Sequence, residues 1–112
     1  MNQNTGDVLD QLIRVLQDRK ANPSEKSYTA SLFEKGDAKI CEKITEESAE
    51  LVEAALESEN PSTEHLIHEA ADLFFHTFVL LVNRGLTLDA IRDEMERRFG
   101  TSGLEEKASR SN

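Results

Sequence analysis

Four acidic residues at helical spacing are the part of this sequence best suited to chemistry. Glu47 and Glu50 are three residues apart, and so are Glu69 and Asp72. Residues three apart lie on one face of an α-helix, about one turn from each other. Eighteen residues separate Glu50 from Glu69, enough for one helix to end and a second to run back beside it. We therefore expect two antiparallel helices to bring four carboxylates together.

A cluster of this kind requires a positively charged partner. Carboxylates repel one another in a low dielectric, and burying even one unpaired carboxylate costs several kcal/mol. A hard divalent cation that prefers oxygen ligands is the natural candidate. The sequence therefore predicts a metal site between the two helices.

The elements that must hold these acids are helices, because no segment shows sustained alternation of apolar and polar residues. Breaks are expected at Asn22-Pro23, Gly36, Pro61 and Gly85. We expect helices over residues 7–20, 28–35, 37–59, 63–84 and 87–100, with N-caps at Thr5, Asp37 and Ser62 or Thr63. The second helix follows Ser27, and the last starts at Thr87. The predicted fold is all-α: a bundle of about four to five helices with two long central antiparallel helices.

The first long helix carries an apolar stripe, which we expect to comprise Ile40, Ile44, Leu51 and Ala55. Glu47 falls within this stripe, where a glutamate needs an explanation. Cys41 is expected to be a small buried residue.

The second long helix is apolar around most of its circumference, which is typical of a helix in a core or an oligomer interface. Its polar residues fall on one line: His65, Glu69, Asp72, His76 and Asn83. In the last helix, Leu88, Ile91 and Met95 are expected to face inward.

Composition limits the class of protein. The 112 residues suit one domain, 1–112, with a polar tail over about 101–112. A net charge of −9 argues against nucleic acid or an anionic membrane as a partner. The single cysteine excludes an internal disulfide and a zinc site built from several cysteines. No run of 18 apolar residues and no signal-peptide pattern occur, so we expect a cytoplasmic protein.

Simpler interpretations of the same residues stay open. Each acidic pair alone could be a solvated helix face, and His76 could be a hydrogen-bonded core histidine. His65 and His68, near a helix start, are expected to have no catalytic role. Lys39 and Lys43 could form helical ion pairs with nearby glutamates, worth a few tenths of a kcal/mol. A di-iron bundle is disfavoured because no histidine follows a glutamate by three residues.

The acidic signature resembles that of the all-α, MazG-type nucleoside triphosphate pyrophosphatases. Within that superfamily the chain is similar to the phosphoribosyl-ATP pyrophosphatase family. The similarity runs from Leu9 to about Arg110. It is carried by Ser27-Tyr28-Thr29, Lys39-Ile40, Lys43-Ile44-x-Glu46-Glu47-x-Ala49-Glu50, Glu69-Ala70-Ala71-Asp72-Leu73-Phe74-Phe75-His76, Arg84-Gly85-Leu86-Thr87-Leu88 and Ser102-Gly103-Leu104-Glu105-Glu106-Lys107.

The resemblance implies Mg²⁺-dependent hydrolysis of phosphoribosyl-ATP to phosphoribosyl-AMP and pyrophosphate, the second step of histidine biosynthesis. It also implies a helical bundle that works as a homodimer. Matched position by position, Glu47, Glu50, Glu69 and Asp72 correspond to the Mg²⁺ ligands.

Further roles are expected around this site. Glu46 is the candidate for holding or deprotonating the attacking water, and it could instead bind a second ion. Lys39 and Lys43 could reach phosphate oxygens. His76 could contact phosphate or orient Asp72. The segment Ser27, Tyr28 and Thr29 could close over the phosphoribosyl or base end of the substrate.

Two rival functions are retained. One is a housekeeping pyrophosphatase of the same superfamily that acts on a free nucleotide such as dUTP or dCTP. The other is a non-catalytic, acidic, helical dimerisation module whose carboxylates form only a solvated face.

Overall fold

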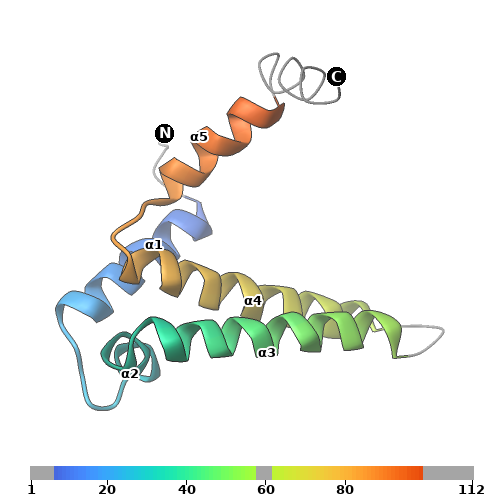
Figure 1. Ribbon diagram of the computed structural model, residues 1–112, viewed down its shortest axis with the longest axis horizontal. Coiled ribbons are helices and arrows are strands. Elements are labelled where there is room, and N and C mark those ends of the chain that lie inside the picture. Colours follow the sequence, from blue (N-terminus) through green and yellow to red (C-terminus); the bar gives the residue numbers. More distant parts are fainter. Residues whose placement is uncertain (1–6, 58–61, 100–112) are drawn as a thin grey trace.

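The structure is a computed structural model that describes residues 7–57 and 62–99. Within these residues it contains five α-helices and no β-strand, which confirms the predicted all-α class (Figure 1). The helices are α1 (Val8–Ala21), α2 (Tyr28–Lys35), α3 (Asp37–Leu56), α4 (Thr63–Asn83) and α5 (Leu88–Phe99).

Side-chain caps explain where several helices begin. The Asp7 carboxylate accepts hydrogen bonds from the backbone N–H groups of Leu9 and Asp10, so Asp7 is the cap of α1 and not its first helical residue. The cap predicted at Thr5 lies outside the described residues. Ser62 caps α4 as predicted, and Ser27 caps α2, each through its hydroxyl oxygen.

The junction of α2 and α3 depends on Gly36. Its φ of +86° lies in a region that residues other than glycine rarely adopt. Gly36 is both the C-cap of α2 and the N-cap of α3. The prediction that Asp37 caps α3 is therefore wrong. Asp37 is the first helical residue, and its carboxylate accepts hydrogen bonds from Asn83 and Arg84 at the end of α4.

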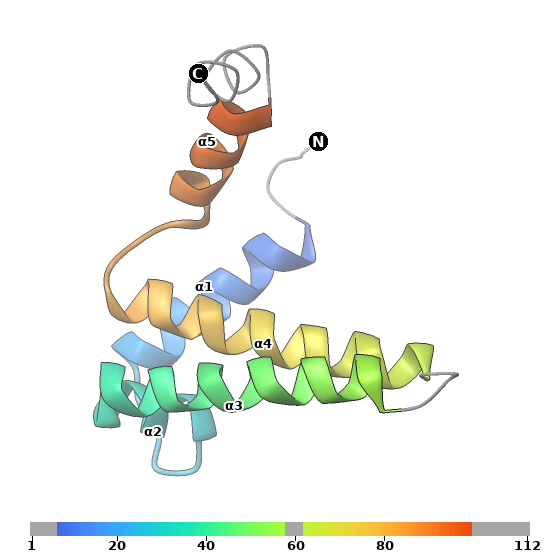
Figure 2. The same ribbon diagram turned by 45° about the vertical axis from the view of Figure 1, so that its right-hand side comes forward.

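Helices α3 and α4 lie side by side in both ribbon views (Figures 1 and 2). Three contacts connect them in order along the chain. Asp37 at the start of α3 meets Asn83 at the end of α4, Glu47 meets His76, and Glu57 just beyond α3 meets His65. This long two-helix layer holds all four acids of the predicted site.

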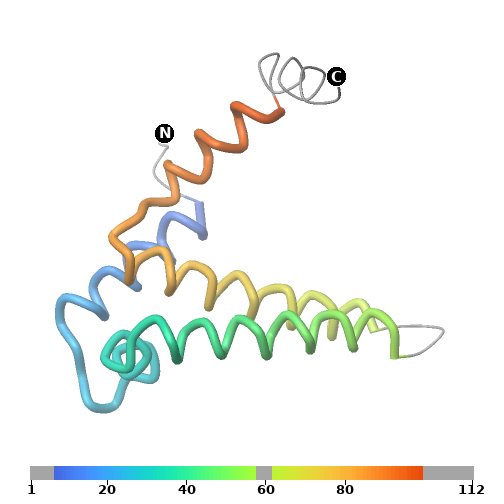
Figure 3. Tube along the Cα trace, in the orientation of Figure 1, coloured from blue at the N-terminus to red at the C-terminus, as the bar shows by residue number. Residues whose placement is uncertain are grey.

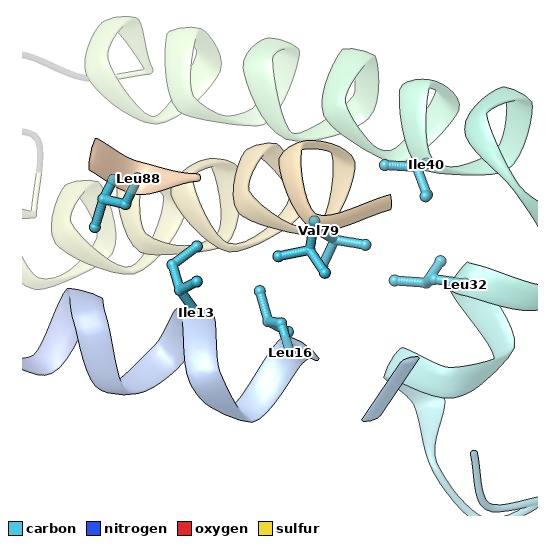
Figure 4. Close-up of a cluster of buried hydrophobic side chains, with 7 residues drawn as sticks. Ile13, Leu16, Leu32, Ile40, Val79 and Leu88 are labelled. Atoms are coloured by element: carbon cyan, nitrogen blue, oxygen red, sulfur yellow. The ribbon is translucent and has the colours of Figure 1, made fainter. Parts of the chain in front are cut away.

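The apolar core lies where the other helices cross the start of α3 and the end of α4. Figure 4 shows side chains from every helix meeting here. The buried members are Ile13, Leu16, Leu32, Ile40, Val79, Val82 and Leu88. The tube view shows that α1 and α2 lie near this end of the layer, away from the end of α3 and the start of α4 (Figure 3). The core therefore fixes one end of the α3–α4 layer and leaves the other end to its own contacts.

Three predicted inward positions are wrong, because the helices are rotated differently from the predicted stripes. Cys41 is exposed, since it follows the buried Ile40 by about 100° around α3. Ala54 is buried in place of Ala55, because the inward positions of α3 repeat every seven residues. Met95 is 53% exposed on α5.

Helix α5 is attached mainly near its beginning. Leu88 is buried, and the Arg92 guanidinium donates two hydrogen bonds of 2.9 Å to the Asp10 carboxylate on α1. Beyond this contact α5 extends away from the α3–α4 layer (Figure 2).

Replacing Leu16 by Ala should destabilise the protein by about 2–5 kcal/mol, because Leu16 is 1% exposed and its loss leaves a cavity in the core. Replacing the neighbouring Val15, which is 44% exposed, by Ala should lower the free energy of unfolding by less than about 1 kcal/mol. Urea unfolding followed by circular dichroism at one fixed protein concentration measures both. Equal losses for the two variants would contradict the described orientation of α1.

Candidate metal centre

Helices α3 and α4 bring three acids together. Glu47, Glu50 and Glu69 each offer a carboxylate oxygen, and these oxygens lie within 4.8 Å of one another. The helical spacing positions Glu47 and Glu50 one turn apart, while Glu69 reaches them from the neighbouring helix. The predicted meeting of acids from two helices therefore occurs for these three residues.

Asp72 lies close to this group without being one of its three members. Its negative charge contributes to the rise in the pKa of Glu47. Its Oδ2 lies 3.3 Å from Nε2 of His68, one turn earlier on α4. The proposed role of Asp72 as a ligand stays a prediction.

The acids differ strongly in burial. Glu47 is 6% exposed and Glu69 is 9% exposed, whereas Glu50 is exposed. The cluster thus has a buried base formed by two glutamates, with the Glu50 carboxylate toward solvent. A ligand could approach from the side of Glu50.

Two buried oxygens in this cluster are unsatisfied. Among the described residues, neither Oε2 of Glu47 nor Oε1 of Glu69 has a hydrogen-bond partner. A buried carboxylate oxygen without a partner is costly, which makes such atoms rare in folded proteins. The donor set is composed of oxygen atoms and fits a hard cation such as Mg²⁺ or Ca²⁺.

The pKa of Glu47 is raised to about 7. Burial is the main cause, the hydrogen bond and negative charge of Glu50 and the charge of Asp72 add to it, and Lys43 opposes the rise. The cluster therefore favours a proton on Glu47 when no cation is present. A divalent cation would replace that proton.

His76 connects the cluster to α2. Its Nδ1 lies 3.0 Å from the backbone carbonyl of Asp72 and 3.5 Å from Oε1 of Glu47. A carbonyl can only accept, so Nδ1 carries hydrogen and, in a neutral ring, Nε2 accepts from the Tyr28 hydroxyl at 2.9 Å. His76 is 5% exposed and fully hydrogen-bonded, which agrees with its interpretation as a bonded core histidine.

The predicted lysines are in ion pairs along α3. Lys39 donates to Glu42 at 2.9 Å, and Lys43 donates to Glu46 at 3.1 Å. The pKa of Lys43 is raised chiefly by its hydrogen bond to Glu46, with smaller contributions from Tyr28 and Glu47. Lys43 therefore lies nearer the cluster than Lys39, whose surroundings are Glu42 and Glu46.

The segment Ser27, Tyr28 and Thr29 is divided between two tasks. The Ser27 hydroxyl oxygen caps α2, and the Tyr28 hydroxyl contacts His76. Thr29 is half-buried in the first turn of α2.

His65 contacts the acidic cluster, although the sequence did not indicate it as a site residue. Its Nε2 lies 3.1 Å from Oε2 of Glu69, and its Nδ1 lies 3.1 Å from Oε1 of Glu57. Both carboxylates raise the pKa of His65, with Glu57 having the larger effect. The four-residue spacing of His65 and Glu69 was the signal that could have indicated the contact.

The raised pKa of Glu47 predicts a pH dependence of stability in metal-free protein. The folded state holds this proton up to about pH 7, whereas the unfolded chain releases it near 4.5. Stability should therefore fall as pH rises through this window, by up to about 3 kcal/mol.

Replacing Glu47 by Gln removes this titration without changing the side-chain shape. The difference in unfolding free energy between the variant and the original protein should grow from pH 5 to pH 8, measured by urea unfolding in the presence of EDTA. Parallel stability profiles would show that Glu47 does not titrate in this range.

The sequence is similar to known proteins over most of its length. The family model described as phosphoribosyl-ATP pyrophosphohydrolase matches residues 9–99. The phosphoribosyl-ATP pyrophosphatase of Geotalea daltonii is 52% identical over 104 residues, which are 93% of this chain and 95% of that protein. The protein of the same name from Hydrogenovibrio crunogenus is 47% identical over 108 residues, which are 96% of each chain.

A third relative extends the match to nearly every residue. The phosphoribosyl-ATP pyrophosphatase of Sphingopyxis alaskensis is 48% identical over 112 residues, covering 99% of this chain and 100% of that protein. With a family match across the described helices and close relatives of the same length, this chain belongs to the phosphoribosyl-ATP pyrophosphohydrolase family.

Proposed function

We propose that this protein hydrolyses 1-(5-phosphoribosyl)-ATP to 1-(5-phosphoribosyl)-AMP and pyrophosphate, the second step of L-histidine biosynthesis. Family membership over residues 9–99 carries this proposal, since the relatives are named for this activity. The clustered oxygens of Glu47, Glu50 and Glu69 support it from chemistry, because hydrolysis of a polyphosphate requires charge neutralisation.

Glu47, Glu50, Glu69 and Asp72 would hold Mg²⁺, with Glu47 and Glu69 as the buried ligands. The unsatisfied oxygens of these two glutamates support the assignment. When bound there, Mg²⁺ would neutralise the charge that develops on the departing pyrophosphate. The two helices supply the rigid support that such a site needs, because each ligand pair is fixed by the helical repeat.

Glu46 would accept the proton of the attacking water. The water oxygen forms a new bond to phosphorus, the bond between phosphorus and the bridging oxygen breaks, and pyrophosphate leaves with that electron pair. Glu46 follows Lys43 by three residues and is exposed, so it can exchange its ion pair with Lys43 for a water molecule. Lys43 would then be free to bind a phosphate oxygen.

Other residues would bind the substrate around this centre. Lys39 would contact the outer phosphate oxygens, and Ser27, Tyr28 and Thr29 would form one wall of the site for the phosphoribosyl or base end. The Tyr28–His76 hydrogen bond supports this placement, because it links α2 to the acidic cluster. His76 is buried behind Tyr28, which favours orientation of neighbouring groups over direct contact with phosphate.

Replacing Glu50 by Gln should lower the rate of pyrophosphate release from phosphoribosyl-ATP by about 100-fold or more, because a ligand charge is lost without a change in volume. Release is measured with and without Mg²⁺, beside ATP, dUTP and dCTP. Glu53→Gln, one turn further on the exposed face of α3, is the matched control and should keep its activity.

Near-normal activity of the Glu50→Gln variant would contradict the metal site. Release from dUTP or dCTP in place of phosphoribosyl-ATP would assign the protein to the housekeeping pyrophosphatases. Mg²⁺ should also raise the melting temperature of the original protein and have little effect on the variant.

The protein would act as a cytoplasmic homodimer in which α3 and α4 run antiparallel. The order of contacts from Asp37–Asn83 to Glu57–His65 supports the antiparallel pair. Helix α4 carries an exposed stripe of Ile67, Ala71 and Phe74, spaced four and three residues apart, with Ile67 and Phe74 more than half exposed. An apolar stripe of this kind suits a second copy of the helix.

By length and composition α4 could also cross a membrane. The same helix carries Glu69 of the acidic cluster and, one turn later, Asp72, and α4 contacts α1, α2 and α3. Acidic side chains in the middle of a membrane-spanning helix are costly in lipid. The exposed apolar stripe of α4 therefore suits a protein partner better than a bilayer.

Replacing Phe74 by Glu should shift the protein from dimer to monomer, because a carboxylate on the stripe would be buried in the interface. Sedimentation velocity measures the change. Val8→Glu on α1, where Val8 is 71% exposed, is the control and should leave the dimer intact. A monomeric original protein would contradict the proposed assembly.

A further inference from the structure

The three histidines of this chain share one arrangement. All of them lie on α4, and each approaches the carboxylate of one acid at the site: His65 that of Glu69, His68 that of Asp72, and His76 that of Glu47. Two of these carboxylates, those of Glu47 and Glu69, are buried. Of the two histidine contacts with buried acids, that of His65 is the shorter, at 3.1 Å against 3.5 Å for His76.

His65 is held on both sides of its ring. Nε2 lies 3.1 Å from Oε2 of Glu69 on the same helix, one turn away. Nδ1 lies 3.1 Å from Oε1 of Glu57, the residue that follows α3. Both ring nitrogens are hydrogen-bonded to carboxylates, one on α4 and one just beyond α3, so rotation of the imidazole would break a hydrogen bond.

The oxygen of Glu69 that His65 does not contact is the unsatisfied one. Oε2 is bonded to His65, whereas Oε1 is buried without a partner among the described residues. Glu47 shows the same division, since Oε1 lies 3.5 Å from His76 and Oε2 is unpartnered. In each buried glutamate, a histidine therefore contacts one oxygen and the other remains available to a cation.

We propose that His65 is a positioning residue that fixes the Glu69 carboxylate, with Glu57 as its anchor, so that one oxygen is held ready for the divalent cation. The inference rests on the proposed function, because it assumes that the acidic cluster binds a cation. His65 itself touches neither cation nor substrate in this role.

The physical effect is preorganisation of one ligand. Without His65, the Glu69 side chain gains rotational freedom that cation binding must then remove. Partners that orient metal ligands typically change metal affinity by 10–100-fold. A purely electrostatic role would act in the opposite direction, because removing a positive imidazole would strengthen cation binding.

The test is the affinity of substrate-free protein for Mg²⁺ and Mn²⁺, measured by isothermal titration calorimetry. His65→Leu should weaken binding by about 10-fold or more. His68→Leu is the comparison variant. His68 approaches the partly exposed Asp72 at 3.3 Å and its side chain is 69% exposed, against 41% for His65, so it restrains its acid less; it should change affinity less than about threefold.

Two further variants examine the mechanism and guard against misfolding. His65→Gln retains an N–H group able to donate to Glu69 and should restore part of the affinity. Glu57 is exposed, and Glu57→Gln removes the charge that anchors His65. This variant should lose less Mg²⁺ affinity than His65→Leu. Circular dichroism of metal-free protein checks that each variant folds.

Activity gives a second measurement. In the His65→Leu variant the Mg²⁺ concentration for half-maximal rate should rise about 10-fold, while kcat at saturating Mg²⁺ returns to within about twofold of the original. A loss of kcat that Mg²⁺ does not restore would overturn a positioning role.

The outcomes separate this inference from the proposed function. If the original protein binds Mg²⁺ and His65→Leu binds it equally or more tightly, the inference is wrong and the proposed function stands. Equal weakening of Mg²⁺ binding by His65→Leu and His68→Leu would also overturn the inference, because the effect would then not depend on the contact between His65 and Glu69. If the original protein binds neither ion, both the inference and the metal site are wrong.

Discussion

The burial of two glutamates between α3 and α4 is the constraint on which the rest of this structure depends. Glu47 and Glu69 lie on facing helices and are less than one-tenth exposed, and each has an oxygen without a partner in the part of the chain that the structure describes. Such an arrangement opposes folding, because buried acids repel one another and lose hydration. Other parts of the fold must therefore stabilise the α3–α4 layer.

That stabilisation comes from the opposite end of the layer. Side chains from all five helices meet around Ile40 and Val79, both fully buried, and Asp37 bonds to the end of α4. The acids lie further along α3 and α4, beyond this core. The separation lets the core provide stability while the acidic end retains its unsatisfied oxygens.

Within the acidic end, His65 and His76 connect the buried glutamates to Glu57 and Tyr28, which are at least partly exposed. Contacts at the surface of the protein can in this way influence the two buried carboxylates.

The prediction from sequence was most accurate where local rules apply. Gly36 ends α2, Ser62 caps α4, and the five segments are helical. It failed where the rotation of a helix decides burial. Cys41 and Met95 are exposed, and Ala54 is buried in place of Ala55, because the packing of neighbouring helices selects the inward face from several apolar ones.

The sequence by itself determined the helical class, the family and the spacing that aligns Glu47 with Glu50 and Glu69 with Asp72. These properties follow from the period of the helix and from the order of residue types, both of which are local. Only the tertiary structure decided that Glu47 and Glu69 are buried while Glu50 is exposed, that Asp72 lies outside the group of three, and that His65 joins Glu57 to Glu69. Burial and contact across helices depend on how α3 and α4 are rotated and aligned against each other, which no single helix specifies.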